Sequence, residues 1–125
     1  MQEKKILLVE DSESLRSVLA EKLADEHYTV LTAGGGEEGL RVGQAEHPDL
    51  IITDIVMFPM DGLEMAKKIR ESSGVWGAQV YIIALSNQNS TEEAGRVEPL
   101  HLNAYLVKAE TGLDDVIMHV KDMLK

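Results

Sequence analysis

Short apolar runs alternate with stretches of helical periodicity along most of the chain. The runs cover residues 5–9, 28–33, 49–54, 80–85 and 104–107. Their apolar residues are mostly consecutive rather than alternating, which is typical of strands covered on both faces. Each run therefore predicts a strand of a parallel sheet.

Between the runs, apolar residues recur at intervals of three and four, as on one face of a helix. Helices are expected around residues 15–23, 37–46, 63–70 and 91–97. A last helix carries the clearest stripe, at Leu113, Val116, Ile117, Val120 and Leu124. The helix after the third strand should stop by Gly74. Trp76, in the glycine-flanked loop that follows, is expected to lie as a lid over the start of the fourth strand.

About five strands that alternate with about five helices predict an α/β fold. Such a fold is doubly wound, with a parallel sheet, helices on both faces and right-handed crossovers. The chain has 125 residues, a common size for one domain, and no linker, repeat or low-complexity segment divides it. We therefore expect a single domain over residues 1–125.

The composition narrows the class of protein. The net charge of −10 disfavours nucleic acid and anionic membranes as partners. The absence of cysteine excludes disulfides, zinc–cysteine sites and a cysteine nucleophile. The first apolar run is too short for a signal peptide or a membrane span. We therefore expect a cytoplasmic protein.

Charged and hydroxyl residues follow four of the five predicted strands. The carboxyl ends of parallel strands meet at one edge of the sheet, where open α/β proteins hold ligands. Carboxylates suit a hard cation such as Mg²⁺, and a carboxylate can also attack phosphorus to form an aspartyl phosphate. A lysine and a hydroxyl would stabilise the transferred phosphoryl group. The residues at this edge are Glu10, Asp11, Asp54, Ser86 and Lys108.

Each of these residues also has a purely structural interpretation. Glu10 and Asp11 could cap the helix that follows them, Asp54 and Ser86 could each be a turn residue, and Lys108 could be a solvated surface residue. Compatible chemistry at four strand ends is less easily explained by chance. The pattern therefore favours one phosphoryl-transfer site.

These residues resemble the receiver domain of bacterial two-component response regulators, and the resemblance extends over essentially the whole chain. It rests on residues 6–11, 82–86 and 105–108, and on Asp54 followed by Met57, Pro59, Met60, Asp61 and Gly62. The similarity is to single-domain regulators of the chemotaxis type. It implies a flavodoxin-like, five-stranded parallel sheet in the order 2-1-3-4-5.

The resemblance implies a phosphorylation site with a bound metal. Asp54 would accept the phosphoryl group. Asp11, Asp54 and the backbone carbonyl of Val56 would bind Mg²⁺, with Glu10 acting through a water molecule. Lys108 would pair with the phosphoryl group.

The resemblance also implies a conformational switch. Ser86 would take the place of the switch hydroxyl that engages the phosphoryl group, and Tyr105 would then swing inward. The phosphoryl group would come from a sensor histidine kinase or phosphotransfer protein, and output would be contact with a downstream protein target. Such a protein catalyses only its own phosphorylation and dephosphorylation, so it is not an enzyme in the turnover sense.

Three positions depart from the family pattern. Phe58 stands where a proline is usual, with Pro59 one residue later, so we expect the loop over the site to have a different shape. Ala109 replaces the proline that usually follows the lysine, and we expect a trans peptide bond there because a non-proline cis bond costs about 2.5–4 kcal/mol. His101 replaces a usual glycine before the fifth strand.

Three other functions compete with this interpretation. A Mg²⁺-dependent aspartyl phosphatase would need a second aspartate two residues after Asp54, where Val56 stands. A flavin-binding module would need a hydroxyl- and glycine-rich loop after the first strand, where the acidic Glu10 and Asp11 would repel the phosphate. A receiver-like protein-binding module that does not use phosphate remains as the alternative, on account of Phe58 and Ala109.

Overall fold

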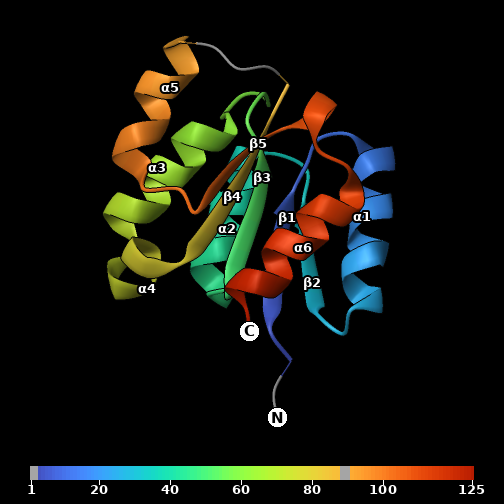
Figure 1. Cartoon of the computed structure of the whole chain (residues 1–125). Helices are drawn as coiled ribbons and strands as arrows, with labels where there is room; N and C mark the ends of the chain where they lie inside the picture. Colours follow the sequence, from blue (N-terminus) through green and yellow to red (C-terminus); the bar gives the residue numbers. More distant parts are fainter. Residues whose placement is uncertain (1–2, 88–90) are drawn as a thin grey trace.

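The computed structural model describes residues 3–87 and 91–125, without the side chains of Thr91 and Glu92. Within these residues, one parallel sheet has the strand order β2-β1-β3-β4-β5 (Figure 1). The predicted fold class and strand order are thus confirmed. The strands are β1 (Lys5–Val9), β2 (Thr29–Ala33), β3 (Leu50–Asp54), β4 (Tyr81–Ser86) and β5 (Ala104–Val107).

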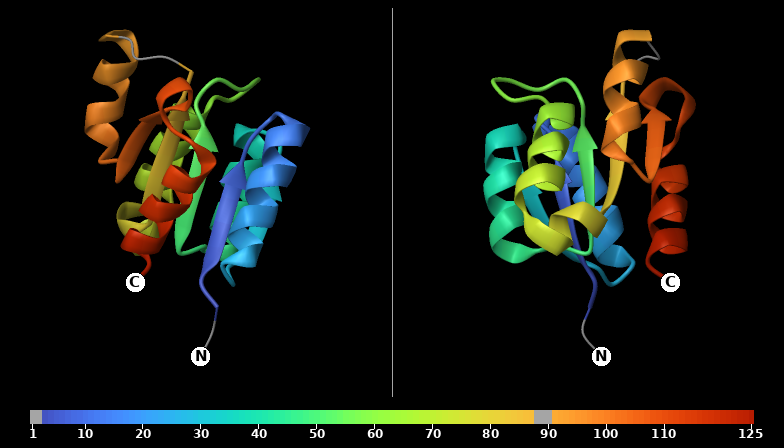
Figure 2. Two further views of the ribbon diagram at one scale, coloured as in Figure 1. Left: turned by 45° about the vertical axis from the view of Figure 1, so that its right-hand side comes forward. Right: turned by 90° about the vertical axis from the view of Figure 1, so that its left-hand side faces the viewer.

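Helices cover both faces of the sheet (Figure 2). One face carries α1 (Glu13–Asp25) and α6 (Leu113–Met123), and the other carries α2 (Gly36–Glu46), α3 (Gly62–Ser72) and α4 (Gly74–Gln79). Helix α5 (Thr91–Val97) and the 3₁₀ turn η1 (Glu98–Leu100) lie beside α3. A second 3₁₀ turn, η2 (Lys108–Glu110), joins β5 to α6. No helix in this described part of the chain is long and apolar enough to cross a membrane.

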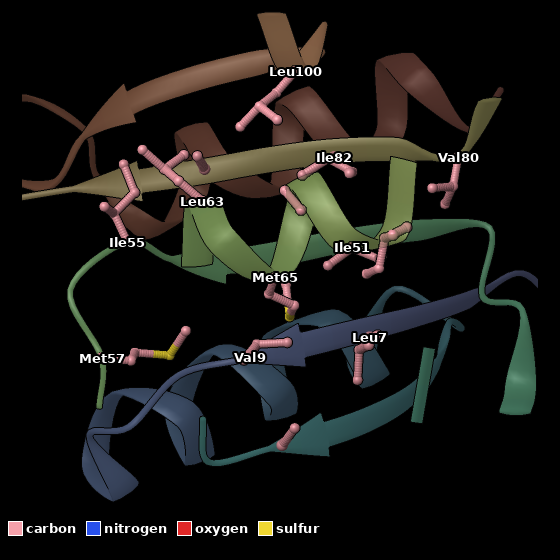
Figure 3. Packing of buried hydrophobic residues seen from close by; sticks show 14 residues of the cluster. Leu7, Val9, Ile51, Ile55, Met57, Leu63, Met65, Val80, Ile82 and Leu100 are labelled. Atoms are coloured by element: carbon pink, nitrogen blue, oxygen red, sulfur yellow. The ribbon is translucent and has the colours of Figure 1, made fainter. Parts of the chain in front are cut away.

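The strands are apolar on both faces because they separate two hydrophobic cores. Leu7, Ile51 and Ile82 pack on the side of α2 and α3 (Figure 3). Their neighbours Ile6 and Ile52 pack on the side of α1 and α6. Successive side chains of a strand point to opposite faces, so a strand covered on both sides needs consecutive apolar residues. Each such side chain contributes about 1.5–3 kcal/mol when buried.

The segment after α3 differs from the prediction. Residues 74–79 form α4 rather than a loop, so the loop prediction is wrong. The Trp76 ring stacks on His47, with centroids 4.6 Å apart, and its Nε1 donates to the Pro48 carbonyl at 2.8 Å. Trp76 therefore fastens α4 to the end of α2 and the segment before β3. An indole with a partner for its N–H can contribute both packing and a hydrogen bond there.

Candidate functional site

The strand register brings the predicted site residues to one edge of the sheet. Val9 pairs with Thr53, so the next residues along β1 and β3, Glu10 and Asp54, lie side by side. Asp54 pairs with Leu85 of β4. Ser86 pairs with Val107 of β5, which places Lys108 just beyond the pair. Parallel pairing thus gathers residues that are far apart in the sequence.

Three carboxylates form an acidic cluster, consisting of Glu10, Asp11 and Asp54. Each offers one oxygen that lies within 4.8 Å of the oxygens of the other two. Glu10 and Asp54 are only 1% and 4% exposed, whereas Asp11 is exposed. The helix-cap interpretation is not needed, because the Ser12 side chain accepts from the Leu15 N–H and caps α1. Glu10 instead accepts from the Ser12 N–H at 3.0 Å.

Lys108 reaches into this cluster from the end of β5. Its Nζ lies 3.1 Å from Asp54 Oδ1 and 3.2 Å from Glu10 Oε1. The same Asp54 oxygen accepts from the Ile55 N–H at 3.0 Å. A single ammonium group therefore holds two buried carboxylates and fixes one oxygen of Asp54.

The charges of this site alter its protonation equilibria. Burial, and then the negative charge of Glu10, raise the pKa of Asp54 to about 6, although Lys108 opposes the rise. Burial lowers the pKa of Lys108, but Asp54 and Glu10 together outweigh it, so its pKa is raised. At neutral pH Asp54 is mainly a carboxylate and Lys108 an ammonium ion. Asp54 is thus ionised but poorly solvated.

Glycines allow the loop after β3 to fold closely over the site. A Cβ on Gly62 would lie 2.0 Å from the Asp54 carbonyl oxygen, and one on Gly36 would lie 2.4 Å from the Met60 carbonyl oxygen. Only glycine permits such close backbone approaches. The loop buries Met57 but leaves the Phe58 side chain 88% exposed.

Ser86 belongs to a second group, which we call the hydroxyl–carboxylate cluster and which consists of Ser86, Tyr105 and Glu93. Ser86 is fully buried, and its Oγ donates to Glu93 Oε1 at 2.7 Å. The Tyr105 hydroxyl lies 2.5 Å from the same Glu93 oxygen and 3.1 Å from Ser86 Oγ. The contact between Ser86 and Tyr105 that the switch requires is present, while the inward swing of Tyr105 stays a prediction.

The sequence patterns do not single out Glu93. It lies on α5, a short helix whose acidic residues resemble any solvated helix face. A weak signal was available, since Glu93 follows the predicted site residue Ser86 by only seven positions. Its side-chain direction depends on how α5 packs, which spacing alone does not determine.

The three departures from the family pattern all have visible outcomes. Among the described residues, the cis peptide bond is Phe58–Pro59, and the Lys108–Ala109 bond is trans as predicted. The turn η2 then leads into α6 while Lys108 still points into the site. His101 has φ = 52°, in the left-handed region that favours glycine. The histidine in place of the usual glycine does not change the preceding helix, since α5 spans Thr91–Val97 as predicted.

The acidic cluster has the ligand chemistry of a hard-cation site. Its oxygens converge from two strand ends, and oxygen ligands are those that Mg²⁺ prefers. Val56, whose carbonyl the family resemblance implies as a further ligand, lies in the loop two residues beyond Asp54 and is half exposed. The acidic cluster could therefore bind a metal ion.

Comparison with protein families identifies the arrangement. The profile of the response regulator receiver domain matches residues 6–121. A probable transcriptional regulator, ycf27 of Porphyridium aerugineum, is 34% identical over 110 residues, which cover 86% of this chain and 43% of that protein. The sensor kinase/phosphatase CqsS of Vibrio cholerae is 32% identical over 106 residues, which cover 85% of this chain and 15% of that protein. The chain thus spans less than half the length of these relatives.

Solved structures give the same result. The chemotaxis protein CheY4 of Vibrio cholerae superposes with a TM-score of 0.87 at 29% identity, over 98% of this chain and 99% of that one. A CheY-like receiver domain from Methanospirillum hungatei superposes with a TM-score of 0.89, over 98% of this chain and 94% of that one. At 24% identity, this likeness supports the fold alone.

Proposed function

Because the chain belongs to the family of response regulator receiver domains, we propose that it is a phosphorylation-activated switch that accepts a phosphoryl group on Asp54. The family is one of signalling receivers rather than turnover enzymes. The single observation that carries the proposal is the position of Asp54, a buried carboxylate held by Lys108 within the acidic cluster. The proposal takes residues 1–125 as one receiver domain.

The proposed reaction is phosphoryl transfer from a phosphorylated histidine of a sensor kinase or phosphotransfer protein. A carboxylate oxygen of Asp54 attacks the phosphorus atom, the P–N bond breaks, and the imidazole leaves with its electron pair and takes up a proton. The product is an acyl phosphate. Asp54 must be ionised for this attack, and with a pKa of about 6 it is mainly ionised at neutral pH.

The surrounding residues neutralise and orient the reacting groups. Lys108 is in place to pair with the phosphoryl oxygens, because it already binds Asp54 Oδ1. A Mg²⁺ ion held by Asp11, Asp54 and the Val56 carbonyl, with Glu10 acting through water, would neutralise charge on the transferred phosphoryl group. The Ser86 hydroxyl would donate a hydrogen bond to that group.

The proposed output is a protein contact on the face formed by α5, β5 and α6. Ser86 and Tyr105 lie on the neighbouring strands β4 and β5 and are hydrogen-bonded to each other. A movement of the Ser86 hydroxyl towards a phosphoryl group would therefore disturb Tyr105 and the surface around it. The downstream target would be a protein, with no direct role for nucleic acid or membrane. Histidine kinases take their phosphoryl groups from ATP, so the proposal places this exchange in the cytoplasm.

The test is incubation with a small-molecule phosphodonor such as acetyl phosphate, with Mg²⁺ or with a chelator. We expect the mass of one phosphoryl group to appear on the peptide that contains Asp54, only when Mg²⁺ is present. No mass gain from a small donor or from a phosphorylated histidine kinase would instead support the receiver-like module that does not use phosphate.

A further inference from the structure

Glu93 lies where it can control the switch hydroxyl. Glu93 lies on α5, and its Oε1 accepts a hydrogen bond from the Ser86 hydroxyl, with an oxygen–oxygen distance of 2.7 Å. Ser86 is fully buried at the end of β4, one residue beyond the partner of Asp54 in the sheet. The side chain that would have to engage a phosphoryl group on Asp54 is therefore bound to the carboxylate of Glu93.

A serine hydroxyl has one proton to donate. While that proton is donated to Glu93, it is not available to a phosphoryl oxygen. Both acceptors are anionic, and hydrogen bonds to ionised acceptors are roughly twice as strong as neutral ones. The carboxylate of Glu93 and a phosphoryl group on Asp54 would thus compete for the same donor.

We propose that Glu93 is a positioning residue that holds the Ser86 hydroxyl away from the phosphorylation site and is displaced when Asp54 is phosphorylated. This inference rests on the proposed function. Displacement also changes the second partner of Glu93, because the Tyr105 hydroxyl binds the same carboxylate oxygen. One event at Ser86 would then alter the hydrogen bonds of both α5 and β5.

The contacts of α5 provide a matched control. Arg96, on the same helix, binds both carboxylate oxygens of Asp61, at 2.9 and 2.8 Å. Asp61 caps the start of α3 and accepts from the Glu64 N–H. Glu93 and Arg96 therefore both hold α5 to neighbouring elements. The contact of Glu93 is with the switch hydroxyl of Ser86, whereas that of Arg96 is with Asp61. Arg96→Ala loosens α5 without removing the competitor for Ser86.

The test measures the affinity of the Mg²⁺-loaded protein for beryllofluoride, a mimic of the phosphoryl group. Glu93→Ala should bind it about fivefold more tightly than the wild type, the equivalent of one net hydrogen bond. Glu93→Gln keeps the shape and an acceptor oxygen but loses the charge, so its gain should be smaller. Arg96→Ala should have wild-type affinity.

The same substitution in Ser86→Ala protein distinguishes an effect of Glu93 on the Ser86 hydroxyl from a general loosening of the fold. In Ser86→Ala protein, Glu93→Ala should no longer change the beryllofluoride affinity, because the donor for which the two anions compete is absent. In addition, the amide shifts of α5 in free Glu93→Ala protein should move towards those of the wild-type complex.

The outcomes distinguish this inference from the proposed function. If the wild type binds beryllofluoride but Glu93→Ala has unchanged or weaker affinity, the inference is wrong while the proposed function stands. An equal gain in Arg96→Ala, or a gain that persists in Ser86→Ala, would likewise overturn it. If the wild type takes up neither beryllofluoride nor phosphate, both are wrong.

Discussion

The two polar clusters at the carboxyl edge of the sheet differ in how their charges are balanced. The acidic cluster brings three carboxylates together with the single ammonium group of Lys108. In the hydroxyl–carboxylate cluster, two hydroxyls bind one carboxylate, that of Glu93. The acidic cluster therefore has an excess of negative charge. In the hydroxyl–carboxylate cluster, neutral hydroxyl groups donate to the one charged group, the Glu93 carboxylate.

This difference suggests different roles for the two clusters. Crowded carboxylates favour the binding of a cation and raise the cost of keeping Asp54 ionised. A hydroxyl that exchanges one anionic acceptor for another keeps a hydrogen bond of similar strength, so the exchange has a small net cost. The acidic cluster is therefore suited to binding and chemistry, and the hydroxyl–carboxylate cluster to a change of partners.

Asp54→Asn should abolish phosphoryl uptake, because an amide nitrogen or oxygen cannot replace the attacking carboxylate. Asp49→Asn makes the same chemical change just before the other end of β3, where Asp49 accepts from the Lys5 N–H. It should leave uptake unchanged. The measurement is the mass gain after incubation with acetyl phosphate and Mg²⁺. Uptake by Asp54→Asn at the wild-type yield would show that another residue is the acceptor.

Mg²⁺ should stabilise the protein against unfolding, by about 2.7 kcal/mol at a hundred times its dissociation constant. Asp11→Ala should weaken Mg²⁺ binding and reduce this effect, because it removes one of the three carboxylates. Asp25→Ala, at the end of α1, is a control for the loss of one negative charge. Thermal unfolding over a Mg²⁺ titration measures both. Equal Mg²⁺ affinity in Asp11→Ala and the wild type would exclude Asp11 as a ligand.

In metal-free protein at about pH 7, Asp54→Asn should increase the free energy of unfolding by about 1–2 kcal/mol. The cause is the raised pKa of Asp54, about 6 against 3.8 for the ordinary group. A carboxyl group with a raised pKa in the folded state contributes stability below its unfolded pKa and loses it as the pH rises through about 6.

The stabilisation by Asp54→Asn should therefore disappear below about pH 4, where the wild-type carboxyl is protonated in both states. Urea unfolding in the presence of a chelator, at neutral and acidic pH, measures it. A gain that is the same at both pH values would argue against the ionisation of Asp54 as its cause.

Tyr105→Phe should have the smallest effect, a loss of about 0.5–1 kcal/mol of unfolding free energy. The Ser86–Glu93 hydrogen bond remains to satisfy both partners. Tyr81→Phe, at the start of β4 and exposed, is the matched control. Denaturant unfolding gives both values. A loss of several kcal/mol in Tyr105→Phe would show that this cluster is a rigid part of the fold rather than one that exchanges partners.

Much of the fold and of the acidic cluster was predictable because both depend on local patterns combined with one topological rule. Consecutive apolar residues identify strands covered on two faces, and parallel strands end at a common edge. Glu10, Asp54 and Lys108 directly follow or end such strands, so their convergence required only the strand order. The trans bond at Ala109 followed from the cost of the cis form.

Local patterns in the chain therefore specify the sheet, its edge and the carboxylates that meet there. The positions of the side chains on the short helices depend instead on long-range packing. Trp76 forms part of α4 because its ring packs on His47 and its N–H reaches Pro48, contacts that no local pattern of glycines indicates. Glu93 reaches Ser86 because α5 packs beside α3 and β5. Helices of so few residues have little stability of their own, so long-range packing sets their position.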